Sequence, residues 1–230
     1  MALADDIRAV RDRARAELNA VDDYLFHSVQ SWTTASMSFV ADPTRTYQNP
    51  TTGTIVSGAQ LAALSLRYTS KQLREATFQQ FLSVFEVFVG DLLRAWLTAH
   101  PRAVGGKTVK FEDALDAGDL PTLVAQVVDH EIAEVTYKSP RTVFQYIERR
   151  IGLPLPTAAE IDQLAEAKAT RDVIVHNRGV IDAAYLLKAG ALARHTAGQF
   201  VDIPNPYHRV TWELVAKLVA DFAAGALARA

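Results

Sequence analysis

Apolar positions recur at spacings of three and four along much of the chain, which is the period of one face of an α-helix. The first series predicts a long amphipathic helix and comprises Leu3, Ile7, Val10, Ala14, Leu18, Val21 and Leu25. Over about residues 70–100 the apolar positions cover most sides, which predicts a buried central helix; they are Phe78, Phe81, Leu82, Phe85, Phe88, Val89, Leu92, Leu93 and Trp96. Helices are also expected over about 120–137, 140–151 and 211–228.

Turn-forming residues mark where these helices begin and end. Ser139 before Pro140 predicts a helix start, and Thr157-Ala158-Ala159-Glu160 reads as a capping box that opens a helix over about 158–177, with Gly179 as its stop. A short helix should follow near 182–189.

Strand patterns are scarce. The stretch 41–58 holds Asp42-Pro43, Asn49-Pro50 and Gly53 among threonines, which predicts a surface loop, either a linker or a flap. An alternating pattern that could form a strand is confined to 207–211. The predicted fold is therefore all-α, a helical bundle with an additional long N-terminal helix.

The length and composition suit one sizeable core. The chain has 230 residues, is 49% hydrophobic and carries a formal net charge of -2. We expect an N-terminal extension over 1–70, made of the first helix and the loop, and a helical domain over 71–230. A near-neutral chain of this kind could meet nucleic acid only through a local basic patch.

Several classes are excluded or disfavoured. The chain has no cysteine, which excludes disulfides, thiolate zinc sites and cysteine nucleophiles. No apolar stretch follows the charged first twelve residues, and Glu86, Asp91 and Arg94 interrupt the apolar run 78–97, so neither a secretory signal nor a membrane span is expected. We expect a soluble, cytoplasmic protein without a membrane partner.

The strongest candidate chemistry is the hexapeptide from Arg171 to His176. Five helical steps rotate about 500° and rise about 7.5 Å, so these two side chains diverge by about 140° and should flank a groove. Asp172 precedes His176 by four residues, where its carboxylate could accept a hydrogen bond from the ring and, together with the helix dipole, favour the protonated imidazole. Arg171 offers a planar fork that matches phosphate oxygens, and Arg178 would lie nearly in line with it if the last turn stays helical.

A structural alternative stands beside this interpretation. An arginine and a histidine near a helix end also serve as a C-terminal cation and a satisfied, partly buried histidine. Small residues behind His176, namely Ala165, Ala169 and Val173, would let a second helix come close. Two copies packed through such faces about a two-fold axis would place two arginines and two histidines in one groove.

The segment from Arg171 to Asp182, which contains His176-Asn177-Arg178-Gly179, resembles the signature of HEPN domains, in particular their ribonuclease-like bacterial branch, in which a tyrosine such as Tyr185 follows. The region around Phe85-Glu86 looks like that branch's core helix, and residues 137–153 look like the helix leading to its motif. The resemblance covers about residues 73–227.

The resemblance implies a helical bundle that dimerises through the motif helices and cleaves RNA without metal or cofactor, often in toxin or antiviral systems with an antitoxin or defence partner protein. Arg171 and His176 would be the catalytic pair, with Asp172 as the intervening polar residue and Asn177 and Arg178 in support. At the position of Asp172, members of the family more often carry asparagine. Arg178 stands where the branch silenced by nucleotidyltransferases carries a tyrosine, which argues against that mode of silencing.

The implied reaction is attack of an RNA 2′-hydroxyl on the adjacent phosphate, which gives a 2′,3′-cyclic phosphate. His176 would move protons and Arg171 would stabilise the charge of the transition state. DNA lacks the attacking hydroxyl and should survive. The rival interpretation is a HEPN-like module that keeps the motif helix for dimerisation or partner binding and does no chemistry; the near-neutral charge favours the module, and the complete Arg, polar, His set favours the enzyme.

Two further clusters are candidates. A basic stretch could follow RNA phosphates or could be a solvated helix face; it consists of Lys138, Arg141, Arg149 and Arg150, accompanied by Tyr137 and Tyr146. His130 and Glu134 have the spacing of a metal pair, but no second motif completes a ligand set, so no metal site is expected.

Overall fold

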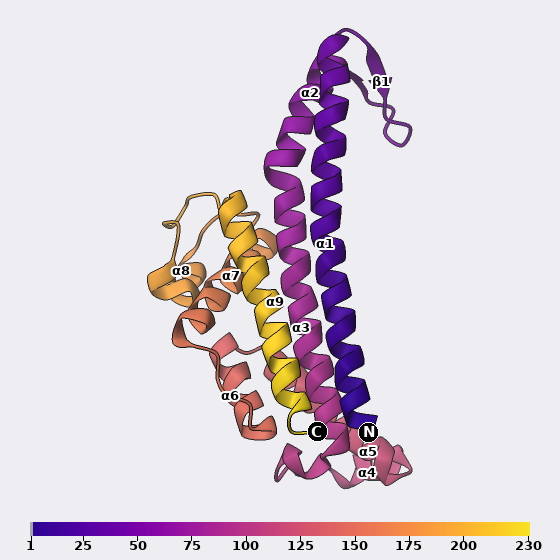
Figure 1. Ribbon diagram of the computed structural model, residues 1–230, viewed down its shortest axis with the longest axis vertical. Helices are drawn as coiled ribbons and strands as arrows, with labels where there is room; N and C mark the ends of the chain where they lie inside the picture. The colour runs from indigo at the N-terminus through magenta and orange to yellow at the C-terminus, as the bar shows by residue number, and fades with distance from the viewer. Residues whose placement is uncertain (1) are drawn as a thin grey trace.

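The computed structural model describes residues 2–230, and it is an all-α helical bundle (Figure 1). Three long helices run side by side in its lower part (Figure 1): α1 (Ala2–Ala41), α3 (Leu73–Ala99) and α9 (Asn205–Leu227). The shorter helices cover one side and one end of this trio: α4 (Phe111–Ala117), α5 (Leu120–Thr136), α6 (Pro140–Ile151), α7 (Ala158–His176) and α8 (Ala183–Ala189). The predicted fold class is confirmed.

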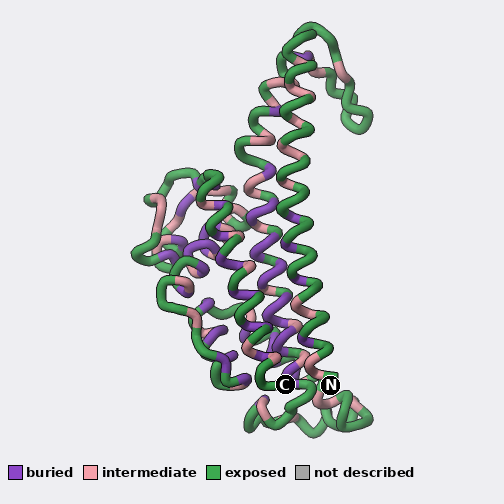
Figure 2. Tube along the Cα trace, viewed as in Figure 1, coloured by how far each residue is buried: buried purple, intermediate pink, exposed green. Residues whose placement is uncertain are grey.

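The core is built around α3, as its apolar pattern predicts. Phe78, Phe81, Leu92 and Leu93 are among its fully buried side chains, and Figure 2 shows buried positions along the whole lower part of this helix. The apolar face of α1 belongs to the same core and contributes Ile7, Ala14, Leu18 and Val21. Burial of one such aromatic side chain contributes about 1.5–3 kcal/mol. The lower part of α1 is therefore a component of the core.

The upper end of α1 and the segment that follows it project beyond the rest of the bundle (Figure 1). The prediction of a plain loop over 41–58 is wrong, because β1 (Thr46–Gln48) and β2 (Ile55–Ser57) form a small antiparallel hairpin there. Strands of three residues are too short to show an alternating pattern. The turn between β1 and β2 is stabilised by the Asn49 side chain, which accepts hydrogen bonds from the backbone N–H groups of Thr51 and Thr52.

The expected boundary near residue 70 falls inside a continuous helical stretch. It consists of α2 (Gly58–Arg67), a π-helical turn (Tyr68–Gln72) and α3. Gly58 starts α2 directly against the carbonyl oxygens of Phe39 and Asp42, where a Cβ atom would collide with the backbone. This close approach returns the chain toward α1.

Local capping chemistry sets several boundaries as predicted. The Ser139 side chain accepts from the Thr142 N–H and begins α6. In the capping box of α7, Thr157 Oγ1 accepts from the Glu160 N–H at 3.2 Å, while Glu160 accepts from the Thr157 N–H at 2.8 Å. The possible strand over 207–211 is wrong, because these residues lie inside α9, which has a proline in its first turn.

A smaller apolar cluster joins the end of α7 to the segments that follow it. It contains Ala169, Val173, Ile181, Tyr185, Ala189 and Val201. An isolated bridge between Val180 and Phe200 ties the two ends of this region together. In residues 2–230, no helix combines the length and the apolar character that crossing a bilayer requires.

Candidate functional site

A groove of about 730 Å³ runs along α7, between α3 and the junction of α5 with α6. Arg171, Asp172 and His176 all line it, so the structure brings the main residues of the predicted site to one open surface. Both Arg171 and His176 reach this groove from α7.

The groove carries more positive than negative side chains. Its cations are Arg94, Lys138, Lys168, Arg171 and Lys188, and its carboxylates are Glu86, Asp91 and Asp172. The excess of cations contrasts with the formal net charge of -2 of the whole chain. It provides the local basic patch that binding of a polyanion requires.

Arg171 is anchored by a carboxylate from the core helix. Its Nη2 donates to Glu86 Oε1 at 2.8 Å. Its Nε lies 3.1 Å from Asp172 Oδ1, but no hydrogen bond forms there, and this buried atom has no hydrogen-bond partner within residues 2–230. The guanidinium is therefore held in place at one corner while other N–H groups remain available to a ligand.

Sequence reasoning missed Glu86 and Lys168 as parts of the site. Lys168 Nζ lies 2.8 Å from the same Glu86 oxygen that binds Arg171. The only signal in the sequence was that Glu86, Asp91 and Arg94 interrupt an otherwise apolar helix. All three line the groove, so these interruptions mark its α3 wall.

Asp172 does not orient His176. Its Oδ2 accepts a hydrogen bond from Lys188 Nζ at 2.9 Å, and its Oδ1 faces Arg171. The expected bond from the imidazole to Asp172 is thus replaced by contacts with two permanent cations. Lys188 reaches Asp172 from α8, a partner that spacing within α7 cannot reveal.

His176 is exposed in the last turn of α7, and the helix ends there. Both the Asn177 and the Gly179 N–H groups donate to Val173 O, and the Asn177 side chain donates to Val180 O. Asn177 therefore closes the helix end.

Arg178 and Gly179 both take the left-handed conformation, with φ of 53° and 80°. Because the last turn does not stay helical, Arg178 does not lie in line with Arg171, and it is not among the residues that line the groove. The helix stop therefore spans two residues, whereas the sequence suggested Gly179 alone.

Tyr185 is a core residue, which excludes it from direct contact with RNA. It is buried, and its hydroxyl donates to Glu166 Oε1 at 2.9 Å. Glu166 is itself buried on α7 and also accepts from Thr170, Tyr207 and Arg194. Burial raises the pKa of both tyrosines, so their hydroxyls stay protonated and donate to this carboxylate.

The small residues behind His176 are only partly open. Ala165 and Ala169 line the groove, but Ala169 is almost fully buried and lies with Val173 in the cluster that packs against α8. The face available to another helix is therefore narrower than the sequence suggests.

Three of the four basic residues share one surface. Lys138, Arg149 and Arg150 line a pocket separate from the groove, and Lys138 also borders the groove, whereas Arg141 pairs with Asp162 at 3.1 Å. Tyr137 is 92% exposed, whereas Tyr146 is buried and offers no stacking surface.

His130 Nε2 lies 3.4 Å from Glu134 Oε1, and no group of three or more metal-ligating side chains occurs in residues 2–230.

Comparisons with protein-family models, with characterised proteins and with solved structures give no match to this chain.

Proposed function

We propose that the groove along α7 binds RNA and that the chain is an endoribonuclease. The observation that carries the proposal is that Arg171 and His176 line one open, cation-rich groove. A phosphodiester is the natural ligand for a planar guanidinium fork beside an imidazole and several lysines. The resemblance of the motif helix to HEPN domains supports the same assignment.

The proposed reaction needs no group beyond the chain and its substrate. The 2′-oxygen of the ribose forms a bond to phosphorus, and the bond from phosphorus to the 5′-oxygen breaks. Neutral His176 takes the proton of the 2′-hydroxyl, and the resulting imidazolium returns a proton to the leaving 5′-oxygen. Arg171 donates to the phosphoryl oxygens, on which negative charge grows in the transition state.

The active form in this proposal is a homodimer that joins two motif helices. Arg171 and His176 diverge around α7, so a second copy would supply the facing half of the groove. Mixing Arg171→Ala protein with His176→Ala protein tests this directly. If the pair that acts on one phosphate comes from two protomers, mixed dimers regain one intact site and part of the activity; if both residues act within one chain, mixing restores nothing.

Cleavage of total RNA in excess EDTA tests the chemistry. We expect cleavage to persist in chelator, to leave DNA intact and to disappear in Arg171→Ala and His176→Ala variants. Matched controls are Arg209→Ala, an exposed arginine on α9, and His27→Ala, an exposed histidine on α1; both should cleave normally. Equal residual activity in all variants would assign the cleavage to a contaminant.

One observation favours a non-catalytic module. Arg171 and Asp172 already make ion pairs within the chain, and no side chain of residues 2–230 donates to or accepts from the His176 ring. Under that alternative the protein dimerises or binds a partner protein through this surface without cutting RNA. A stable dimer that binds RNA or a partner protein and yields no cyclic phosphate would support the module. Wild-type cleavage that is lost in Arg171→Ala and in His176→Ala would support the enzyme, as a toxin or antiviral effector with or without a cognate antitoxin.

A further inference from the structure

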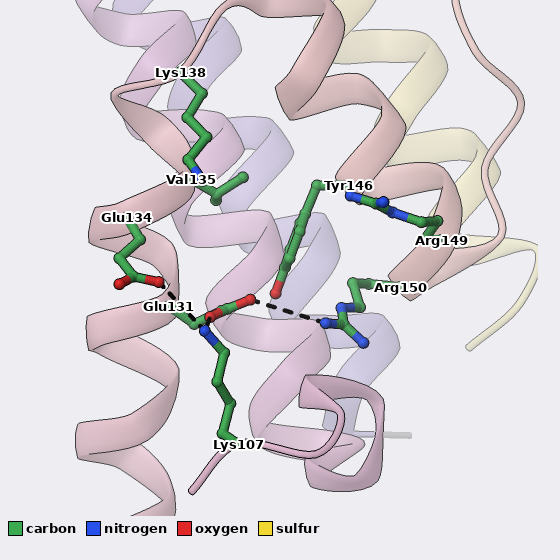
Figure 3. A pocket seen from close by; sticks show the side chains of 8 residues that line it. All are labelled: Lys107, Glu131, Glu134, Val135, Lys138, Tyr146, Arg149 and Arg150. Atoms are coloured by element: carbon green, nitrogen blue, oxygen red, sulfur yellow. Dashed lines mark hydrogen bonds and ion pairs between the residues drawn. The ribbon is translucent and has the colours of Figure 1, made fainter.

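A second pocket, of about 340 Å³, lies between the C-terminal half of α5, the second half of α6 and the segment after the 3₁₀ turn Pro101–Val104. Figure 3 shows side chains from these three segments turned toward the space between them. The residues that matter are Lys107, Glu131, Lys138, Tyr146, Arg149 and Arg150. Most of the pocket is distinct from the groove, and Lys138 borders both.

Three buried polar atoms of this pocket have no hydrogen-bond partner within residues 2–230: the donors Tyr146 Oη and Arg150 Nε, and the acceptor Glu131 Oε2, which Lys107 holds in a close ion pair. The Tyr146 side chain is only 5% exposed, yet its hydroxyl makes no hydrogen bond within residues 2–230, and neither does the buried Nε of Arg150. Burial, followed by the charge and the hydrogen-bonding proximity of Glu131, raises the pKa of Tyr146 to about 12, so the hydroxyl keeps its proton at neutral pH; it lies near this carboxylate without a well-formed hydrogen bond to it. Buried donors of this kind are rare in folded proteins and point to a ligand that accepts from them.

The carboxylates of the pocket are already neutralised. Glu131 forms a close ion pair with Lys107 Nζ and lies 3.9 Å from the Arg150 guanidinium. Glu134 lies 3.3 Å from the same lysine and 3.4 Å from His130. These carboxylates therefore leave no uncompensated negative charge to repel an anion.

Two cations of the pocket remain free. Lys138 and Arg149 are exposed and form no ion pair within residues 2–230, whereas Lys107 and Arg150 are paired with Glu131. The pocket thus holds four cations against the carboxylates of Glu131 and Glu134. The uncompensated charge is positive, and it lies beside the unpaired donors.

We propose that this pocket binds a phosphoryl group, as a phosphate monoester or diester. Tyr146 and Arg150 would donate from the buried side, and Arg149 and Lys138 would neutralise the charge from the open side. Donors that converge from α6 and from the turn before it suit the several oxygens of a tetrahedral phosphoryl group better than the two coplanar oxygens of a carboxylate. The ligand could be a free nucleotide or a phosphate of an RNA strand that leaves the groove past Lys138; only the second source rests on the proposed function.

Calorimetric titration with inorganic phosphate, with adenosine 5′-monophosphate and with a short 2′-O-methyl RNA tests the proposal. The 2′-O-methyl groups prevent cleavage, so binding is measured apart from catalysis. We expect saturable binding of at least one ester, weakened about fivefold to tenfold by Tyr146→Phe and by Arg149→Gln, since each removes one donor or charge. Arg141→Gln, on the same helix but paired with Asp162, should bind normally.

The probes also separate the two sources. Binding of the monophosphate alone assigns a nucleotide site, and binding of the RNA alone assigns a strand contact. Wild-type protein that binds none of the probes, or that binds them equally in all variants, overturns the proposal. Phosphate binding in this pocket should be the same in Arg171→Ala as in the wild type, and it should persist even if the protein cleaves no RNA. The binding proposal and the ribonuclease proposal can therefore be refuted independently.

Thermal unfolding of Tyr146→Phe gives an independent check. The hydroxyl has no partner in the protein, so its removal should leave the midpoint of the unligated protein unchanged or slightly raised. A marked fall of the midpoint would show that the hydroxyl donates to Glu131, and this would refute its role as a free donor.

Discussion

The contact between Glu86 and Arg171 gives the sharpest test of how the groove is held together. Glu86 Oε1 lies 2.8 Å from both Arg171 Nη2 and Lys168 Nζ. The three side chains are 28%, 20% and 18% exposed, so solvent screens these pairs less than surface pairs. Glu86→Gln keeps the size of the side chain and removes its charge.

The expected cost follows from these contacts. A hydrogen bond to a charged group contributes about 1.5–3 kcal/mol, and a neutral amide keeps part of it while leaving two cations without a counter-charge. We expect Glu86→Gln to lower the free energy of unfolding by about 2 kcal/mol. For a chain of this size each kcal/mol shifts the midpoint by about 2–4 °C, so the midpoint should fall by about 4–8 °C.

A double-mutant cycle assigns this loss to its partners. Urea unfolding followed by circular dichroism should give a coupling energy of about 1 kcal/mol between Glu86→Gln and Arg171→Gln, and a similar one with Lys168→Met. Each coupling should be smaller than the total, because both cations share one oxygen. The matched control is Glu213→Gln, which breaks the exposed pair with Arg209 and should cost less than about 0.5 kcal/mol.

The same variant should also affect activity if the proposed function holds. Loss of its anchor lets the Arg171 fork move away from the phosphate, so cleavage measured far below the unfolding midpoint should fall roughly tenfold to a hundredfold, mainly in kcat. If Glu86→Gln unfolds like the wild type and both couplings are near zero, Glu86 does not hold Arg171, and the account of the groove is refuted.

Three other outcomes concern the supports of the groove. Burial, and secondarily the charge of Arg74, lowers the pKa of His208 from 6.5 to about 4, so the unfolded chain binds this proton at a higher pH than the folded chain does. The free energy of unfolding measured in urea should therefore fall by on the order of 3 kcal/mol between pH 6.5 and 4. In His208→Gln this part of the pH dependence should disappear. Glu166→Gln should lower the free energy of unfolding by about 3 kcal/mol, because Arg194 then keeps a charge without its buried partner; a loss below that of an exposed pair would refute this. Thr157→Ala should cost about 1 kcal/mol in the same assay by removing the cap of α7, whereas Thr157→Ser should restore it.

Some boundaries could be predicted from the sequence because they depend on neighbouring residues alone. The capping box and the glycine stop predicted a helix over 158–177, and α7 spans Ala158–His176. Ser139 and Pro140 likewise marked the first turn of α6. Capping satisfies backbone groups within four residues, so tertiary structure has little power to override it.

Other elements gave no usable signal. The hairpin Thr46–Ser57 consists of two three-residue strands, and α4 covers only Phe111–Ala117. Elements this short have little intrinsic stability and depend on the helices beside them. The sequence showed the turn residues of the hairpin correctly and could not show that the flanking residues pair.

The candidate site was predictable only in part for a similar reason. The sequence placed Arg171 and His176 on one regular helix, and both line the groove. Their actual partners come from elsewhere: Glu86 lies 85 positions before Arg171, and Lys188 reaches Asp172 from α8. A rule limited to neighbours on one helix therefore paired Asp172 with His176. It missed Glu86 as the partner of Arg171 and Lys188 as the partner of Asp172.

The orientation of the groove depends on the opposite side of α7. There the buried Glu166 accepts hydrogen bonds from Tyr185, Arg194 and Tyr207, which belong to three different segments after α7. Contacts from several directions fix the rotation of a helix about its own axis, so this buried carboxylate also determines where Arg171 points. Because α7 carries polar residues both on its buried side and on its groove side, the pattern of apolar positions could not show which polar residues support the groove and which line it.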